Sequence, residues 1–137
     1  MAGPRLRRKV LIVEDEPSIR NILYVLLAGL GCDSDVAHDA AQALAMLRQD
    51  RFEAVLLDLR ASDPPPEQVV SAITEVRPSL VGRVLVITGE VSDPQTFESL
   101  ERSAVPHVAR SQITSHLWMR MRALLGFVHS SADSRTP

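Results

Sequence analysis

The chain alternates between short runs of apolar residues and longer stretches in which apolar residues recur every three or four positions. The clearest short runs are residues 9–13, 54–58 and 84–88. Continuous apolar runs of this length between turn residues predict strands that are buried on both faces, as in a parallel sheet. The helical spacing between them predicts crossover helices, so the pattern as a whole indicates an α/β fold.

Two further strands are weaker in the pattern. Residues 33–37 alternate polar and apolar positions as an edge strand does, and residues 107–109 form a brief fifth strand. Helices are expected from Pro17, after Asp39, around residues 69–76, from Pro94 to about residue 102 and from about Ile113. The domain is predicted to span 9–128, preceded by a basic lead-in (1–8) and followed by a disordered tail (129–137).

Composition narrows the class of protein. At 137 residues with a formal net charge of −2, the chain suits one domain and gives no electrostatic reason to expect binding to nucleic acid. The single cysteine, Cys32, excludes an intramolecular disulfide framework and fits a reducing compartment. Because no signal peptide and no apolar stretch of membrane-spanning length is evident, we expect a cytoplasmic protein without a membrane partner.

Three carboxylates stand at the ends of two predicted strands. Glu14 and Asp15 follow the first strand, and Asp58 closes the third. Open α/β sheets place their ligands at the carboxyl ends of strands, where these acids would meet. Carboxylates gathered in one crevice repel each other and favour a hard cation such as Mg²⁺. The simpler alternative is that such acids cap the following helix and meet its dipole.

Three short motifs carry a resemblance to a known family. They are Val-Glu-Asp-Glu-Pro at residues 13–17, Leu-Leu-Asp-Leu at residues 56–59 and Val-Ile-Thr-Gly-Glu at residues 86–90. In combination and at these spacings the chain resembles the receiver domain of two-component response regulators over residues 9–126. The resemblance implies a doubly wound, flavodoxin-like parallel sheet of five strands in the order 2-1-3-4-5, with five helices.

The resemblance also implies a phosphoacceptor site. Asp58 matches the aspartate that receives the phosphoryl group, and Glu14 and Asp15 match the acids that hold Mg²⁺ together with Asp58 and the backbone carbonyl of Arg60. An aspartate carboxylate is a competent nucleophile for phosphoryl transfer, which depends largely on positioning and charge neutralisation. The implied cofactor is Mg²⁺.

Four more residues match positions that contact or sense the phosphoryl group. Thr88 corresponds to a hydroxyl that turns toward it, and Gly89 to a small residue that leaves access. His107 stands where the family usually has a switch aromatic, and it could equally be an ordinary edge histidine. Arg110 replaces a nearly invariant lysine, which keeps the charge but offers a planar fork in place of a compact point charge.

Other departures from the family lie in loops. Ser111 replaces the proline that usually follows the lysine, and residues 103–106 lack the usual glycine-containing turn. Arg60 and Glu90 each lie two residues beyond a site residue. If they pair across the mouth of the site, they could slow water attack and lengthen the phosphorylated lifetime.

Three functions remain open on the sequence. The favoured one is a stand-alone receiver that accepts a phosphoryl group from a histidine kinase or histidine phosphotransferase and acts through contact with an output protein, as a monomer or a homodimer. Such a module is not an enzyme beyond its own phosphorylation and dephosphorylation. The alternatives are a phosphorylation-independent pseudo-receiver that serves as an adaptor or dimerisation module, and an Mg²⁺-dependent phosphohydrolase. The last class needs a second aspartate at position 60, where this chain has arginine.

Overall fold

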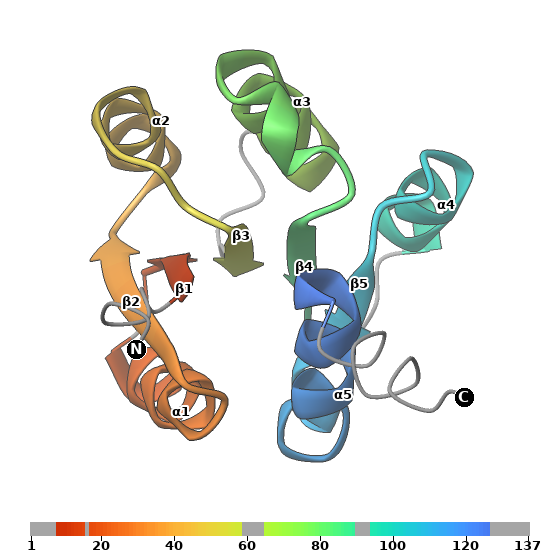
Figure 1. Cartoon of the computed structure of the whole chain (residues 1–137). Helices are drawn as coiled ribbons and strands as arrows, with labels where there is room; N and C mark the ends of the chain where they lie inside the picture. The colour runs from red at the N-terminus through yellow and green to blue at the C-terminus, as the bar shows by residue number, and fades with distance from the viewer. Residues whose placement is uncertain (1–7, 16, 59–64, 90–93, 127–137) are drawn as a thin grey trace, which may run out of the picture.

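The computed structural model describes residues 8–15, 17–58, 65–89 and 94–126, with the side chains of residues 17–18 and 94–97 left aside. These residues form a five-stranded parallel sheet in the order β2-β1-β3-β4-β5 (Figure 1). The strands are β1 (Arg8–Glu14), β2 (Cys32–Ala37), β3 (Ala54–Asp58), β4 (Val84–Thr88) and β5 (His107–Ala109). The predicted fold class and strand order are therefore confirmed, with β2 at an edge as its alternating pattern indicated.

Helices cover both faces of the sheet (Figure 1). They are α1 (Pro17–Gly29), α2 (Ala40–Gln49), α3 (Pro66–Val76), α4 (Pro94–Arg102) and α5 (Ile113–Leu125), with short 3₁₀ turns η1 (Pro78–Leu80) and η2 (Arg110–Gln112). One apolar cluster joins the sheet to α1 and α5, and a second joins the other face to α2, α3, η1 and α4. No helix in the described ranges is long and apolar enough to cross a membrane.

Local signals explain several boundaries. The Asp39 side chain accepts a hydrogen bond from the Gln42 backbone N–H at 2.8 Å and so caps α2, the helix predicted to follow Asp39. The Gln42 side chain in turn accepts from the backbone of His38 at 2.7 Å, one residue earlier than in the standard capping box. At the far end of the chain, Gly126 takes a left-handed conformation (φ 83°) that ends α5.

The strand register determines which residues meet where the strands end. Glu14 pairs with Asp58 across β1 and β3, and Thr88 pairs with Ala109 across β4 and β5. Because all five strands are parallel, these residues lie together where the strands end, and Arg110 follows directly after β5. We call this side the carboxyl end of the sheet.

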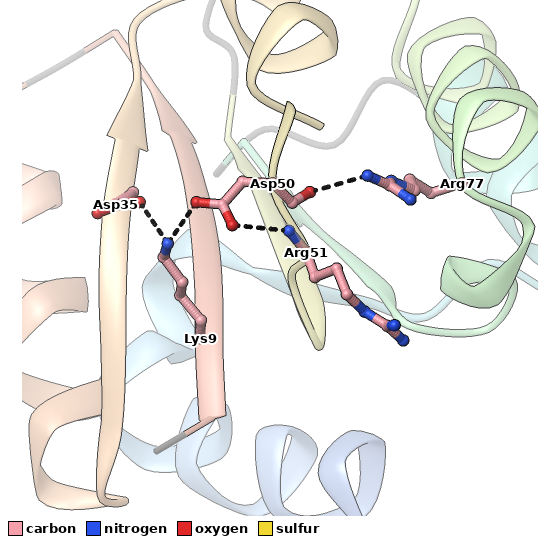
Figure 2. Close-up of polar contacts among 5 residues, drawn as sticks. All are labelled: Lys9, Asp35, Asp50, Arg51 and Arg77. Carbon is pink, nitrogen blue, oxygen red and sulfur yellow. Dashed lines mark hydrogen bonds and ion pairs between the residues drawn. The ribbon is translucent and has the colours of Figure 1, made fainter. Parts of the chain in front are cut away.

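The opposite end of the sheet, where the strands begin, carries a charged cluster of its own, which we call the amino-end cluster (Lys9, Asp35, Asp50 and Arg77; Figure 2). Lys9 pairs with Asp50 at 2.5 Å and with Asp35 at 3.4 Å. Arg77 donates to the backbone oxygen of Asp50 at 3.3 Å. The hydrogen bond between Lys9 and Asp50 raises the pKa of Lys9 and lowers the pKa of Asp50.

Two smaller predictions concern the ends of the domain and the cysteine. β1 begins at Arg8, one residue before the predicted start of the domain, whereas the rest of the lead-in and the tail lie outside the described residues. Cys32 opens β2 with a buried thiol and, as the single cysteine, forms no intramolecular disulfide.

Candidate functional site

The carboxyl end of the sheet buries two carboxylates side by side. Asp58 and Glu14 are the final residues of β3 and β1, they pair in register, and both have no exposed surface. Each directly follows four buried apolar residues of its own strand, so the strand that builds the core also carries its carboxylate inside. Burying a charge is costly unless it is paired and hydrogen-bonded, so this arrangement needs a nearby cation.

Arg110 supplies that cation. Its Nη2 donates to Oδ1 of Asp58, and its side chain is only 13% exposed. The guanidinium reaches the carboxylate from η2, which begins directly after β5, so the sheet topology brings together residues 52 positions apart. The sequence predicted that Arg110 contacts a phosphoryl group. In the structure it engages the proposed acceptor itself.

The Asp58–Arg110 pair keeps unused hydrogen-bonding capacity. Within the described part of the chain, Oδ2 of Asp58 and Nε of Arg110 are both buried and have no hydrogen-bond partner. A buried polar atom left without a partner typically costs about 1–3 kcal/mol. Such atoms are rare in folded proteins, and one explanation is a catalytic or ligand-binding role. Asp58 thus has one oxygen held by Arg110 and one oxygen available.

Thr88 and Gly89 lie at the end of β4, close to Arg110 in the fold. The Thr88 hydroxyl donates to the backbone oxygen of Val108 at 3.5 Å, a distance at which a hydrogen bond is weak. Gly89 is exposed, and a Cβ added there would lie 4.0 Å from Nη1 of Arg110. The roles predicted for these two residues, toward a phosphoryl group, stay predictions.

His107 opens β5, and its ring contacts α4. Nδ1 lies 2.9 Å from the backbone oxygen of Val105, and Nε2 lies 3.2 Å from Oε2 of Glu101 in the last turn of α4. The side chain is 15% exposed. Both ring nitrogens therefore face oxygen acceptors, and the imidazole connects the strand that precedes Arg110 to α4.

Three predicted site residues remain to be placed: Asp15, Arg60 and Glu90. Asp15 is exposed just beyond β1, and Arg60 and Glu90 lie outside the described residues, so their proposed pairing stays a prediction. In the described ranges, no three acidic, histidine or cysteine side chains converge as a metal centre. The donor chemistry nevertheless fits a hard cation, because two buried carboxylates lie in register and Oδ2 of Asp58 has no hydrogen-bond partner among the described residues.

Two features of the site were not predicted. The direct pairing of Arg110 with Asp58 depends on the conformation of a long side chain, which sequence spacing does not determine. The contact of Glu101 with His107 could have been predicted, because a short connection from the end of α4 into β5 brings these two residues close together.

Comparisons with known proteins agree with this architecture. A family model described as the response regulator receiver domain matches residues 10–121. The transcriptional regulatory protein CpxR of Klebsiella pneumoniae is 30% identical over 128 residues, which cover 93% of this chain and 53% of that protein. The DNA-binding response regulator MtrA of Mycolicibacterium smegmatis is 29% identical over 120 residues, which cover 88% of this chain and 51% of that protein. The chain thus spans about half the length of these two relatives.

Solved structures show the same fold. A CheY-like response regulator receiver domain protein from Methanospirillum hungatei superposes with a TM-score of 0.75 at 20% identity, covering 92% of this chain and 99% of that one. The receiver domain of the sensor histidine kinase PA1611 from Pseudomonas aeruginosa, which has a magnesium ion in its active-site cleft, gives 0.72 at 18% identity over 88% and 99% of the two chains. The family model, the relatives and the strand order agree, and the chain belongs to the response regulator receiver domain family.

Proposed function

We propose that this receiver accepts a phosphoryl group on Asp58 from a histidine kinase or histidine phosphotransferase. The observation that carries the proposal is the state of the Asp58 carboxylate. One oxygen is bound by Arg110, and the other is buried and, among the described residues, has no hydrogen-bond partner. An acceptor needs a carboxylate that is held in place, charge-compensated and still has an oxygen able to attack.

The transfer step follows from this geometry. Oδ2 of Asp58 attacks phosphorus, a new O–P bond forms as the P–N bond to the donor histidine breaks, and the departing imidazole keeps the bonding electron pair. Arg110 keeps Oδ1 in place and lowers the cost of gathering negative charge in a buried site. A divalent cation held by Glu14, Asp15, Asp58 and the carbonyl of Arg60 would supply further charge neutralisation for the phosphoryl oxygens.

Phosphorylation would offer new hydrogen-bond acceptors to the nearby donors of Arg110 and Thr88. The acyl phosphate brings new negative charge and strong acceptor oxygens to a site that already contains a guanidinium with an unused Nε–H. We expect Arg110 to turn toward these oxygens and Thr88 to give up its 3.5 Å contact with Val108. Because His107 precedes Arg110 by three residues and contacts Glu101 at 3.2 Å, we expect phosphorylation to change the position of α4.

Intact-mass measurement after incubation with acetyl phosphate and Mg²⁺ tests the proposal. We expect a labile mass increase of one phosphoryl group in the native chain and none in Asp58→Asn. The matched control is Asp50→Asn, which removes an aspartate from the amino-end cluster and should phosphorylate normally. Equal labelling of native chain and Asp58→Asn, or no labelling of a folded native chain, contradicts the proposal.

A second candidate is a pseudo-receiver that acts as an adaptor without phosphorylation. The observation in its favour is that Arg110 already occupies one oxygen of Asp58. On this alternative, Arg110→Lys, which restores the residue usual in the family, should create labelling that the native chain lacks. On the phosphoacceptor proposal both proteins label, and they differ in the lifetime of the product.

The output and the lifetime of the signal are also proposals. The relatives MtrA and CpxR are described as DNA-binding and transcriptional regulators, whereas we propose that the described domain transmits its signal by contact with another protein. The predicted pairing of Arg60 with Glu90 is tested by neutralising each residue and timing loss of the phosphoryl group. A faster loss supports it, and an unchanged lifetime rules it out.

A further inference from the structure

A groove of about 410 Å³ is lined by α3 and by the turns that lead into β4 and β5. One wall is the outer surface of α3, from Glu67 through Val70 and Ser71 to Thr74. The other walls are the turn into β4 and residues 103–106, which lead from α4 into β5. We call it the α3–β5 groove.

Among its described lining residues, the groove holds one carboxylate, and no described basic side chain pairs with it. Glu67 lies in the first turn of α3, and its Oε1 is buried and accepts no hydrogen bond from any described residue. None of the described residues that line the groove is basic. A desolvated carboxylate oxygen without a donor is costly, so this position favours a cation or a strong N–H donor supplied from outside.

The rest of the lining is mostly apolar. Val70, Val81, Val84, Val105 and Pro106 contribute aliphatic surface, and Val81 is 69% exposed. The hydroxyl of Thr74 is already used, because it donates to the backbone oxygens of its own helix at 3.1 Å. An aliphatic stem that ends in a positive charge matches such a lining better than a small hydrophilic ion does.

The loop that forms one wall is held in a strained conformation. Ala104 has φ 56°, the one left-handed non-glycine residue in the described chain. Its neighbours keep it there, since Ala104 N–H donates to Glu101 and Val105 N–H donates to Leu100. Left-handed backbone at an alanine is unfavourable, and residues of this kind cluster at ligand-binding and switch regions.

We infer that the α3–β5 groove binds a basic segment of a partner protein, with an arginine or lysine stem along the valines and its charge at Glu67. The inference rests on charge complementarity: a carboxylate that has no basic partner among the described residues, in an apolar groove, calls for a long, flexible, positively charged side chain. Glu67 follows Asp58 by nine positions in the chain, and residues 103–106 directly precede His107. The groove thus contacts two segments that lead to the phosphoacceptor site.

The role of this groove as an output surface rests on the proposed function, but the binding itself does not. A titration of the unphosphorylated chain tests the groove alone, and a failure of phosphorylation leaves its result unchanged. The probe is the peptide acetyl-Val-Arg-Val-amide, and the matched probe is acetyl-Val-citrulline-Val-amide, which keeps the shape and removes the charge.

Amide chemical shifts in ¹H–¹⁵N spectra report the binding position. We expect the arginine peptide to shift the amides of α3 from Glu67 to Thr74 and those of residues 81–84 and 103–105, with an affinity of about 1 mM. The citrulline peptide should bind about tenfold more weakly, as should the arginine peptide to Glu67→Gln. Glu75→Gln, on the exposed part of the same helix and outside the groove, should bind as the native chain does.

A second variant supplies the cation from the chain itself. Ser71 lies one helical turn after Glu67, so Ser71→Arg places a guanidinium at i, i+4 from the carboxylate. We expect this variant to fold and to lose binding of the arginine peptide. Equal binding of the two peptides, an unchanged affinity in Glu67→Gln, shifts confined to another surface, or no shifts at 20-fold the expected Kd (about 20 mM peptide) would overturn the inference.

Discussion

Acidic and basic side chains gather at both ends of the sheet, and the two groups differ in burial and in how far their polar atoms are satisfied. At the carboxyl end, Asp58 is wholly buried against Arg110, and each retains a polar atom without a partner among the described residues. At the amino end, Lys9 and Asp50 are partly exposed, and Lys9 bridges two acids (Figure 2). The Lys9 ammonium also lies 5.2 Å from the centre of the Phe52 ring.

We interpret this difference as one between charged groups that stabilise the fold and charged groups that stay available for chemistry. Exposed ion pairs in water contribute little and are tolerant of change, and the amino-end cluster satisfies its groups with local partners. A buried pair with unused atoms is expensive to maintain, and replacing such pairs by apolar residues often stabilises a protein. The unsatisfied end is therefore where we expect selection for chemistry over stability.

The largest expected effect comes from removing the buried cation. Arg110→Met should lower the free energy of unfolding by about 3 kcal/mol at neutral pH without divalent cations, because the buried Asp58 then loses its basic partner. The matched variant at the other end is Arg77→Met, which loses hydrogen bonds to the backbone oxygens of Leu47 and Asp50 and should cost about 1 kcal/mol. Urea denaturation of both measures the contrast, and equal losses would remove it.

Divalent cation should stabilise the carboxyl end alone. If Mg²⁺ binds with a Kd of about 1 mM, a concentration of about 10 mM adds about 1.4 kcal/mol to the free energy of unfolding. Glu14→Gln should abolish most of this gain, whereas Asp35→Asn in the amino-end cluster should keep it. Thermal denaturation with and without Mg²⁺ provides the measurement, and a gain that survives Glu14→Gln would place the cation elsewhere.

A smaller effect is expected in the loop before β5, at the amino end. Ala104→Gly should raise the free energy of unfolding by about 0.5–1 kcal/mol, because glycine adopts φ 56° without the steric cost that alanine meets. The control Ala45→Gly, at an exposed position inside α2, should lower it by about 1 kcal/mol. Urea midpoints compare the two, and a loss of stability in both variants would show that the backbone at Ala104 is not strained.

The smallest effect is expected for Lys9→Met in the amino-end cluster, and it should depend on pH and salt. The lowered pKa of Asp50 means that the pair stabilises the fold above the ordinary carboxylate pKa and loses this contribution as the pH falls through the lower folded value. The raised pKa of Lys9 preserves the contribution up to alkaline pH. Urea midpoints of native chain and variant should therefore converge below about pH 4 and also in about 1 M salt. A difference that persists under both conditions would mean that Lys9 acts through packing on Phe52 and not through charge.

Much of the fold could be predicted from the sequence, because the beginnings and ends of the apolar runs are clearly marked. β4 and β5 begin and end where the apolar runs predicted, and α4 spans the predicted residues from Pro94 to Arg102. Once the strands are parallel, register alone brings Glu14 beside Asp58. The common location of the acids therefore needed only the strand assignments and the rule that ligands lie at the carboxyl ends.

Side-chain conformation was the part that the sequence did not determine. The Asp58–Arg110 pair and the contact of His107 with Glu101 depend on rotamers of long or planar groups brought together by tertiary packing. The left-handed backbone of Ala104 was equally hidden, because alanine gives no local signal for it. The missing glycine in residues 103–106 identified the loop as unusual without indicating how it would fold.

The most direct test of the central claim is to identify the phosphorylated residue by chemical trapping. Borohydride reduces an aspartyl phosphate to homoserine, so peptide mapping after treatment with acetyl phosphate, Mg²⁺ and borohydride reports the acceptor position. We predict homoserine at position 58 and none at positions 15, 35 or 50. Homoserine at another aspartate, or none in a chain shown to be folded, would contradict the assignment of the carboxyl end of the sheet as the phosphoacceptor site.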